Sequence, residues 1–369
     1  RAVQNFTGLG NYSRYVADIL CHFYPENDYV LYAPKKRENK RMNLLTGQYR
    51  QLTLAYPATS FWKKLSSLWR VWGITSQLEK EGIELFHGLS NELPLNIHKS
   101  RIKSIVTIHD LIFLRYPQYY QSIDRKIYTY KFRKACENAD KIIAISECTK
   151  RDITRYFNIP DDKIEVVYQG CDVSFTHPVT EEKKEEVRKK YQLPDHYILN
   201  VGSIEERKNI LAAVQALPML PQHIHIVIVG RRTGYTKKVE QFIKDNGLGE
   251  RVHIISNVPF NDLPAFYQSA EIFVYPSRFE GFGIPIIEAL YSGIPVVAAT
   301  GSCLEEAGGP DSIYVNPDDI TGLADAFKQI YSNSDKRKNM VEKGREFAKR
   351  FSEKQQSEEI INIYKKLIR

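Results

Sequence analysis

A glycine-rich turn between an apolar run and a helical pattern constrains this chain more than any other feature. Residues 272–275 are apolar, residues 281–283 read Gly-Phe-Gly, and residues 286–290 have helical spacing. This order predicts a strand, a tight loop and a helix, and the first N–H groups of a helix favour an anion such as phosphate. Glu280 before the loop and Glu288 within the helix could bind hydroxyl groups on either side of that phosphate. Phosphate flanked by two polyols describes a sugar nucleotide.

The rest of the chain alternates apolar runs with helical patterns. Several apolar runs lack polar alternation, as expected for strands that are buried on both faces of a sheet. Alternating strands and helices predict an α/β fold with parallel sheets. We expect strands at 29–32, 85–86, 105–108, 141–145, 164–168, 197–201, 225–229, 252–255 and 295–298, and helices that include 11–23, 124–139, 149–157 and 210–216.

The length of 369 residues favours two domains over one. A loop at 171–177 and a highly charged segment at 178–190, interpreted as a solvated helix, mark the boundary. The first domain is expected to span residues 1–173 together with the C-terminal helix at 352–369. The second domain is then formed by residues 174–351.

The charge differs between the two halves of the chain. Residues 1–170 hold 26 Lys and Arg against 17 Asp and Glu, whereas residues 171–369 hold 26 against 27. The basic first half indicates an anionic partner, such as phosphate, an acidic glycan or a membrane surface, or serves only solubility.

The cysteines and the hydropathy pattern bear on the cellular setting. The five cysteines are scattered and odd in number, so neither a disulfide framework nor a zinc site is indicated. No apolar run approaches the roughly 18 residues of a membrane span, and the polar start predicts no signal peptide. We therefore expect a cytoplasmic enzyme, with the inner face of the plasma membrane as a second setting.

Gly8 and Gly10 precede the first helical pattern. They indicate either a tight turn or a close approach of the backbone to a phosphate. In a doubly wound domain such a loop follows the central first strand, yet no strand-like run comes before Phe6. We hypothesise that residues upstream of Arg1 supply that strand, and a complete first sheet without it would contradict the hypothesis.

Cationic residues follow two of the expected strands of the second domain. Gly202, Arg207 and Lys208 come after the run at 197–201, at the strand end where open α/β sheets bind ligands. Arginine can fork onto phosphate oxygens, and lysine adds a point charge. Arg231 follows the run at 225–229 and is either a ligand or an exposed cation. Backbone groups near Val258, after the next strand, could contact a nucleobase edge.

Two histidines end expected strands of the first domain. His109 follows the run at 105–108 and could meet a hydroxyl group or a developing charge, although a lone histidine is more often structural. His87 ends another strand in the same way and is the weaker candidate.

All three tryptophans fall within residues 62–72. Trp62, Leu65, Trp69 and Trp72 share one helical face, and the neighbouring cations lie largely off it. This pattern fits a helix at a membrane interface, or a helix that packs its aromatic side chains on its own sheet, and the second interpretation is favoured.

Other chemistries find little support in the sequence. There is no Asp-x-Asp pair for a metal-bound diphosphate and no G-x-S-x-G nucleophile elbow, so we expect neither a metal nor another cofactor. Basic residues are interspersed with acidic ones and form no stacking platform, which disfavours nucleic-acid binding.

Taken together, these motifs resemble the retaining glycosyltransferases of the large family typified by sucrose synthases and bacterial mannosyl- and glucosyltransferases of cell-envelope glycans. The resemblance implies the GT-B fold, an α/β fold of two Rossmann-like doubly wound parallel-sheet domains that face each other across a cleft. In such proteins the C-terminal helix usually crosses back to the first domain. The resemblance covers nearly the whole chain and rests on residues 8–12, 107–111, 144–150, 201–209 and 280–288.

The resemblance also implies roles for individual residues. The donor diphosphate would be held by Arg207 and Lys208, the ribose hydroxyls by Glu288, and the transferred sugar by Glu280. Backbone groups of Gly281, Phe282 and Gly283 would contact the sugar and the distal phosphate. Gly10 would contact the diphosphate, and His109 would contact the sugar. Val258 and Arg231 would lie near the base.

These roles form a coherent reaction. Fixed cations and helix dipoles can stabilise a leaving diphosphate without a metal ion. Retention then follows either from a double displacement with Glu280 as nucleophile, or from attack on the leaving-group face with the diphosphate taking the proton, and we favour the second. A GT-B sugar-nucleotide epimerase and a non-catalytic nucleotide-sugar-binding protein remain as alternatives, and the acceptor is expected to be a glycan or a lipid-linked sugar.

Overall fold

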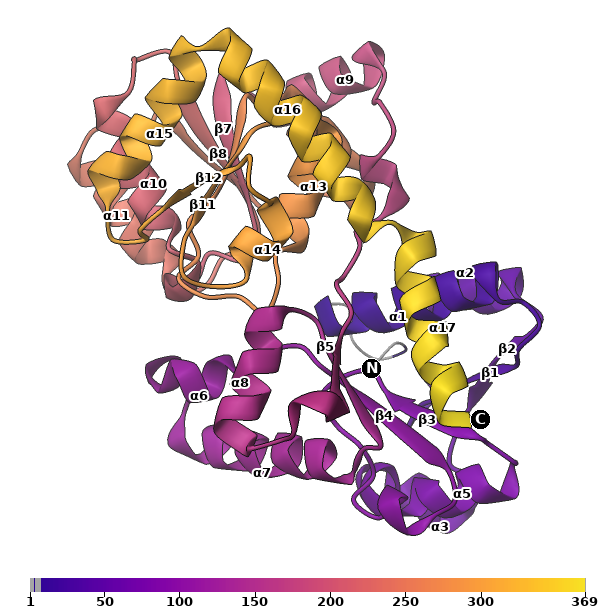
Figure 1. Ribbon diagram of the computed structural model, residues 1–369. Helices are drawn as coiled ribbons and strands as arrows, with labels where there is room; N and C mark the ends of the chain where they lie inside the picture. The colour runs from indigo at the N-terminus through magenta and orange to yellow at the C-terminus, as the bar shows by residue number, and fades with distance from the viewer. Residues whose placement is uncertain (1–2, 4–7, 369) are drawn as a thin grey trace. The chain divides into compact units, whose positions relative to one another are not determined.

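The computed structural model describes residue 3 and residues 8–368 of the chain (Figure 1). These residues form two compact units. Unit 1 comprises Arg1–Tyr168 and Glu353–Arg369, and unit 2 comprises Gln169–Ser352. The sequence placed the boundaries at 173/174 and 351/352. Phe6 and Thr7, which were expected in the first loop, lie outside the described residues.

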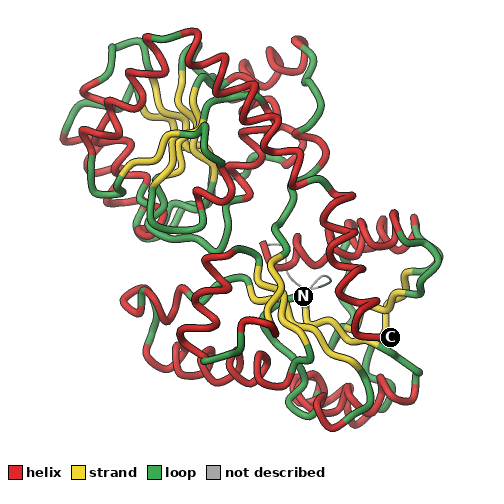
Figure 2. The backbone as a smooth tube through the Cα atoms, viewed as in Figure 1, coloured by secondary structure: helices red, strands yellow, loops and turns green. Residues whose placement is uncertain are grey.

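Unit 1 contains two parallel sheets within its described part (Figure 2). Two strands form the smaller sheet, in the order β1-β2, and four form the larger one, in the order β3-β4-β5-β6. The strands are β1 (Tyr29–Tyr32), β2 (Leu52–Ala55), β3 (Leu85–Gly88), β4 (Lys103–Ile108), β5 (Lys141–Ala144) and β6 (Ile164–Val166).

Helices cover both faces of the four-stranded sheet. Because successive side chains of a strand point to opposite faces, Ile105 packs against α1 and α17, whereas Val106 packs on the side of α5, α7 and α8. The helices of unit 1 are α1 (Gly8–Phe23), α2 (Lys40–Gln48), α3 (Ser60–Lys64), α4 (Ser66–Leu68), α5 (Ile74–Lys80), α6 (Ile112–Arg115), α7 (Ser122–Asn138), α8 (Glu147–Phe157) and α17 (Glu353–Ile368).

The start of α1 corrects one expectation. Gly8 and Gly10 lie in the first turn of this helix and not in a loop that precedes it. The sequence argument placed the two glycines ahead of the helix, in a tight turn or a loop close to a phosphate. In the first turn the N–H groups have no intrahelical partner to lose, so glycine costs less there than in a helix interior.

The tryptophan segment is also less regular than its spacing predicted. Short helices α3 and α4 are followed by one π-helical turn, η1 (Trp69–Gly73), and then by α5. Trp69 is buried in the core, but Leu65 is 38% and Trp72 47% exposed. The four side chains therefore do not share one buried face, because the breaks rotate the segments relative to one another.

Unit 2 is a six-stranded, fully parallel sheet in the order β12-β11-β10-β7-β8-β9. Its strands are β7 (Tyr197–Val201), β8 (His225–Val229), β9 (Val252–Ile255), β10 (Ile272–Tyr275), β11 (Val296–Ala299) and β12 (Ile313–Val315). The strand order reverses between β7 and β10, and the carboxyl ends at such a reversal form the usual ligand site of a doubly wound sheet.

Three helices of unit 2, α9, α15 and α16, begin with a side-chain cap, from Thr180, Asp319 and Asn333. Thr180 caps α9 by accepting a hydrogen bond from the Lys183 N–H group, and glutamates fill the first turn. The helices are α9 (Glu181–Tyr191), α10 (Ile210–Ala216), α11 (Thr236–Asp245), α12 (Leu263–Ser269), α13 (Ile284–Ser292), α14 (Leu304–Gly308), α15 (Ile320–Ser332) and α16 (Ser334–Ala348). Across the described residues of both units, no helix combines the length and the apolar character that spanning a bilayer demands.

Candidate active site

The candidate site of unit 2 is built on the loops that follow β7 and β10. These two strands are neighbours in the sheet, so the loops after them lie side by side at its carboxyl edge. Arg207 and Lys208 occupy a single 3-10 turn, η6 (Glu206–Lys208), after β7. The backbone N–H of Arg278 donates to the Arg207 carbonyl oxygen at 2.9 Å, which ties the two loops together.

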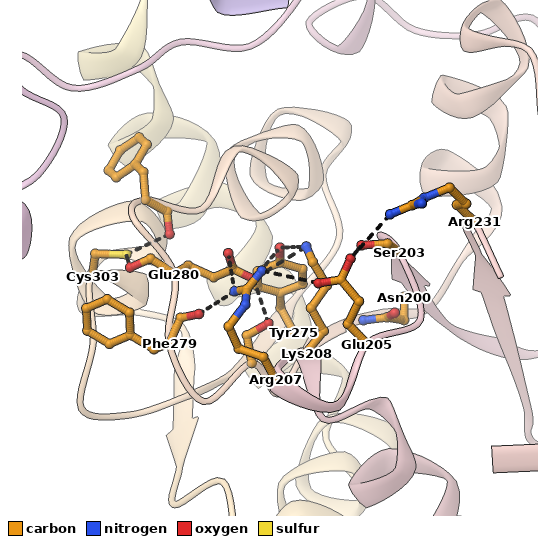
Figure 3. A network of polar contacts seen from close by, with 12 residues as sticks. Asn200, Ser203, Glu205, Arg207, Lys208, Arg231, Tyr275, Phe279, Glu280 and Cys303 are labelled. Carbon is orange, nitrogen blue, oxygen red and sulfur yellow. Dashed lines mark hydrogen bonds and ion pairs between the residues drawn. The ribbon is translucent and has the colours of Figure 1, made fainter. Parts of the chain in front are cut away.

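Glu280 forms ion pairs with both Arg207 and Lys208 (Figure 3). Its Oε2 lies 2.8 Å from Nη1 of Arg207, and its Oε1 lies 3.4 Å from Nζ of Lys208. The hydroxyl groups of Ser277 and Tyr275 donate to Oε1 at 2.9 and 3.1 Å. The three charged side chains are only 13–16% exposed. The site therefore holds two nearly buried cations against one carboxylate.

Each charge in this group keeps its neighbours ionised. Burial alone would raise the pKa of Glu280, but Lys208 and Arg207 together lower it to about 2. Burial alone would lower the pKa of both cations, but Glu280 raises the pKa of each above its usual value. Glu205 lies 3.7 Å from Arg207 and 3.6 Å from Arg231. The wider group therefore holds three cations and two carboxylates, and its one net positive charge suits an anionic ligand.

Glycines allow the cationic loop to lie close to its neighbours. A Cβ atom on Gly230 would lie 1.8 Å from the carbonyl oxygen of Gly202, so no larger residue fits there without a backbone shift. Gly202 has a φ of +152°, and a Cβ atom on it would lie 3.1 Å from Nζ of Lys208. The lysine side chain thus crosses directly over Gly202 toward Glu280.

The glycine-rich loop of residues 281–283 leads into α13, as predicted. Cys303 holds this loop, because its thiol donates to the carbonyl oxygens of Glu280 and Phe282 at 3.0 and 2.8 Å. Gly283 caps the helix, and a Cβ atom there would lie 3.0 Å from the Ala307 side chain. Pro285 in the first turn has no N–H group to satisfy.

Glu288 lies in the second turn of α13 and is half-buried. The hydroxyl group of Tyr267 donates to its Oε2 at 2.6 Å. Burial raises the pKa of Glu288 to about 7, with a further contribution from Asp172 and an opposing one from Tyr267. At neutral pH Glu280 is therefore fully ionised, whereas Glu288, with its pKa of about 7, is near the midpoint of its titration.

The remaining predicted residues of unit 2 lie farther along the same edge. Arg231 is 77% exposed, and its Nη2 lies 3.6 Å from Glu205. Val258 is half-buried in the loop after β9, one residue beyond Asn257, which has a left-handed φ of 60°.

The predicted residues of unit 1 form a separate group. His109 is buried at the end of β4, and its ring meets the ring of Tyr12 edge-on at 4.6 Å. Its Nε2 lies 3.0 Å from the Leu89 carbonyl oxygen. His87 bridges the hydroxyl groups of Thr107 and Tyr364, and burial lowers its pKa to about 3. His87 is therefore neutral, and the hydrogen bonds at both of its ring nitrogens give it a structural role in unit 1.

Three residues that take part in the site were not singled out in the sequence. Tyr275 and Ser277 bind Glu280, and Tyr267 binds Glu288. The signal for the first two was present, because Tyr275 ends the apolar run before the glycine-rich loop and Ser277 follows that run directly after Pro276. Tyr267 lies on α12, and nothing in its local sequence points to α13.

Comparisons with known proteins agree with this geometry. Residues 181–347 match the glycosyl transferases of group 1, and residues 13–175 match glycosyltransferase family 4. The O-antigen chain mannosyltransferase B of Escherichia coli is 30% identical over 289 residues, covering 77% of this chain and 74% of that protein. The O-antigen chain mannosyltransferase RfbU of Salmonella typhimurium is 29% identical over 225 residues, covering 61% and 60%.

Solved structures share the fold. A glycosyltransferase from Rickettsia africae has a TM-score of 0.79 at 20% identity, covering 99% of this chain and 97% of that one. Anabaena Alr3699/HepE in complex with UDP and glucose has a TM-score of 0.77 at 17% identity, covering 98% and 97%. These likenesses establish the GT-B fold.

The chain belongs to the glycosyl transferases of group 1. It is a glycosyltransferase with the GT-B fold, as the motifs predicted, and the epimerase and non-catalytic alternatives are not favoured.

Proposed function

We propose that this glycosyltransferase moves a hexosyl group, with mannosyl as the first choice, from a nucleotide-diphosphate sugar to a glycan or lipid-linked acceptor in cell-envelope polysaccharide synthesis. The observation that carries the proposal is the pair Arg207 and Lys208 at the reversal of strand order, almost buried and oriented toward the glycine-rich loop. The choice of mannose and of the pathway is supported by two relatives named as mannosyltransferases of O-antigen chains. UDP and glucose bound to a protein of the same fold support a nucleotide-sugar donor.

In the proposed donor complex, Arg207 and Lys208 bind the diphosphate, and Glu288 accepts hydrogen bonds from the ribose hydroxyls. Glu280 contacts the transferred sugar, and the first turn of α13 with Gly281, Phe282 and Gly283 faces the distal phosphate. The remaining proposed contacts are those of Gly8, Gly10 and His109 from unit 1, and of Gly202, Arg231 and Val258 on the side of the nucleoside.

The leaving group determines what the cations do. Cleavage of the anomeric C–O bond leaves the bonding electron pair on the diphosphate, and two fixed cations stabilise that charge without reorganisation. We propose that this makes a divalent metal dispensable. Transfer should then continue in excess EDTA, and complete loss of activity that Mg²⁺ or Mn²⁺ restores would contradict the proposal.

The charge state of Glu280 bears on the stereochemical route. A carboxylate whose pKa is about 2, held by two cations and two hydroxyl groups, is a weak nucleophile toward an anomeric carbon. This supports attack by the acceptor oxygen on the leaving-group face, with the diphosphate taking the acceptor proton and the anomeric configuration retained. Proton NMR of the product gives the anomeric configuration directly.

The transfer assay tests the function itself. Purified protein is given GDP-, UDP- and ADP-sugars with and without a lipid-linked acceptor. Arg207→Ala and Lys208→Ala should each reduce transfer roughly 100-fold or more, as removal of a group that stabilises developing negative charge does elsewhere. Glu206→Gln, on the same turn but exposed, is the matched control. Full transfer by both alanine variants would refute the proposal, and a new sugar nucleotide without acceptor would indicate an epimerase.

We also propose that unit 1 contacts an anionic membrane surface, at the inner face of the plasma membrane. Exposed apolar side chains lie on the tryptophan segment and on the start of α7, and Arg70 and Lys131 from these two elements both bind Glu92, at 3.1 and 3.5 Å. The exposed side chains are Phe61, Leu65, Leu68, Trp72, Ile123, Ile127 and Tyr130, and Lys63, Lys64 and Lys126 lie among them in the sequence. Apolar groups with basic neighbours suit an interface with anionic lipids.

Vesicle sedimentation tests this contact. The protein should pellet with phosphatidylglycerol vesicles and much less with phosphatidylcholine vesicles. The triple variant Phe61→Ser, Trp72→Ser and Ile123→Ser should stay in the supernatant with its melting temperature unchanged. Equal sedimentation of the variant and the parent would reject the proposed surface.

A further inference from the structure

Three aromatic rings are stacked on one another in the core of unit 2. Phe273 and Tyr275 lie two residues apart on β10, so their side chains point to the same face of the sheet. The centroids of these two rings are 5.9 Å apart, with an interplanar angle of 19°. Tyr267, from α12, stacks on Phe273 at 5.3 Å and 29°. The three side chains, here called the aromatic stack, are at most 3% exposed.

Both outer rings of the aromatic stack carry a hydroxyl group that binds a charged residue of the candidate site. The Tyr275 hydroxyl donates to Oε1 of Glu280 at 3.1 Å and accepts from Nζ of Lys208 at 2.9 Å (Figure 3). The Tyr267 hydroxyl donates to Oε2 of Glu288 at 2.6 Å. The stack is therefore joined to Lys208 and Glu280 at one end and to Glu288 at the other.

Tyr275 fixes the direction of the Lys208 ammonium group. Nζ of Lys208 lies 2.9 Å from the Tyr275 hydroxyl oxygen but 3.4 Å from Oε1 of Glu280, which is long for a hydrogen bond. The ammonium group also lies over the Tyr275 ring, 5.3 Å from its centroid. An ammonium ion has three N–H groups, so the bond to Tyr275 orients the other two. Loss of the hydroxyl would leave the ammonium group free to rotate and shift.

The core of unit 2 holds the two hydroxyl groups in place. Phe273, the middle ring, lies on a strand whose neighbours pair with it on both sides, at Leu199 of β7 and Val296 of β11. Rings packed on such a fixed residue have little freedom to turn. Burial raises the pKa of Tyr275 to about 12 and that of Tyr267 well above 10, so both hydroxyls stay protonated and can donate at neutral pH.

We propose that Tyr275 and Tyr267 are positioning residues for sugar transfer, Tyr275 acting through Lys208 on the diphosphate and Tyr267 acting through Glu288 on the ribose. The inference rests on the proposed function, which gives Lys208 and Glu288 these two ligands. Negative charge on the diphosphate increases as the anomeric C–O bond breaks, so the position of Lys208 matters most in the transition state. The ribose takes no part in bond breaking, so Glu288 stabilises the ground state and the transition state equally. The two ends of the aromatic stack therefore control different kinetic constants.

Steady-state transfer kinetics of phenylalanine variants separate the two ends. Tyr275→Phe should lower kcat about tenfold or more, as loss of a hydrogen bond to a charged group does, and should change the donor KM less than about threefold. Tyr267→Phe should raise the donor KM to a similar extent and leave kcat within about threefold. Tyr197→Phe is the matched control and should change neither constant. It removes an equally buried hydroxyl at the amino end of β7, which donates to the Phe266 carbonyl oxygen at 2.7 Å.

Two further measurements show whether each tyrosine acts through its charged partner. In a Lys208→Ala background, Tyr275→Phe should cause no further loss of kcat. Isothermal titration compares GDP and UDP with their 2′,3′-dideoxy analogues. The wild type and Tyr275→Phe should prefer the ribose form by about tenfold or more, and Tyr267→Phe should lose most of this preference.

Four results would overturn the inference while leaving the proposed function intact. The first is a kcat of Tyr275→Phe equal to that of the wild type, and the second is the same loss of kcat in Tyr197→Phe. The third is a loss from Tyr275→Phe that persists in the Lys208→Ala background. The fourth is full ribose preference in Tyr267→Phe. A wild type that binds neither GDP nor UDP would instead overturn the proposed function, and this inference with it.

Discussion

Replacement of Glu280 by glutamine should destabilise unit 2 far more than an ordinary surface substitution. Folding lowers the pKa of Glu280 from 4.5 to about 2, which corresponds to about 3 kcal/mol of stability from the ionised carboxylate. Glutamine keeps the shape of the side chain but removes the carboxylate nearest to Arg207 and Lys208 in a nearly buried site, and only the more exposed Glu205, 3.7 Å from Arg207, remains as a counter-charge. Breaking a buried ion pair in this way costs about 3 to 5 kcal/mol, so we expect a loss of that size at pH 7.

Urea unfolding offers a clean assay, because all three tryptophans, Trp62, Trp69 and Trp72, lie in unit 1. Tryptophan fluorescence reports on unit 1, and far-UV circular dichroism reports on both units. Glu280→Gln should lower the urea midpoint of the dichroism transition that belongs to unit 2 and leave the fluorescence midpoint nearly unchanged. The exposed Glu206→Gln should shift neither transition.

The pH dependence follows from the sign of the shift. A carboxyl group with a lowered pKa contributes its full stability above its unfolded value of 4.5 and loses it as the pH falls toward 2. The difference between wild type and Glu280→Gln should therefore be constant from pH 6 to 8 and decrease below about pH 4.5. A loss under 1 kcal/mol at pH 7, or a difference that grows on acidification, would show that Glu280 does not neutralise the two cations.

Three further substitutions test other parts of the site. Glu288→Gln should raise the melting temperature, and more so at pH 8 than at pH 5. The pKa of Glu288 is about 7 in the folded protein against 4.5 in the unfolded chain, so ionisation of the wild-type group costs stability as the pH rises through this window, by about 2 to 4 kcal/mol in full. An equal gain at both pH values would argue against the raised pKa. Gly230→Ala should destabilise unit 2 by several kcal/mol, because its Cβ atom would lie 1.8 Å from the Gly202 carbonyl oxygen, and an unchanged thermal midpoint would show that the loop can move. Arg231→Ala should change the urea midpoint by less than the equivalent of about 1 kcal/mol, since its contact with Glu205 is exposed, and a larger loss would reveal a structural role.

The sequence predicted the type of fold and the edge of the sheet on which the site lies. Unbroken apolar runs identified parallel strands, and polar residues directly after those runs identified the carboxyl ends. Arg207, Lys208 and Glu280 were placed correctly as members of one sheet edge. Their direct contact could not be predicted, because it depends on β7 and β10 being neighbours, and strand order is not written in local periodicity.

The difference in pKa between the two glutamates could not be predicted from the sequence either. Glu280 and Glu288 differ in their pKa because Glu280 contacts two cations, whereas the pKa of Glu288 is raised by burial and by Asp172 and is lowered only by a tyrosine from α12. In the tryptophan segment, by contrast, the sequence predicted an arrangement that the structure does not have. Helical spacing placed four side chains on one face, but breaks near Leu65 and Trp69 rotate the segments apart, so two of them are exposed.

The account rests on binding of a nucleoside diphosphate by Arg207 and Lys208, and isothermal titration measures it directly. GDP and UDP are titrated into the wild type, Arg207→Ala, Lys208→Ala and Glu206→Gln. One of the two nucleotides should bind the wild type and Glu206→Gln with equal affinity and each alanine variant at least tenfold more weakly. Equal affinity across all four proteins, or no binding of either nucleotide to the wild type, would contradict the account.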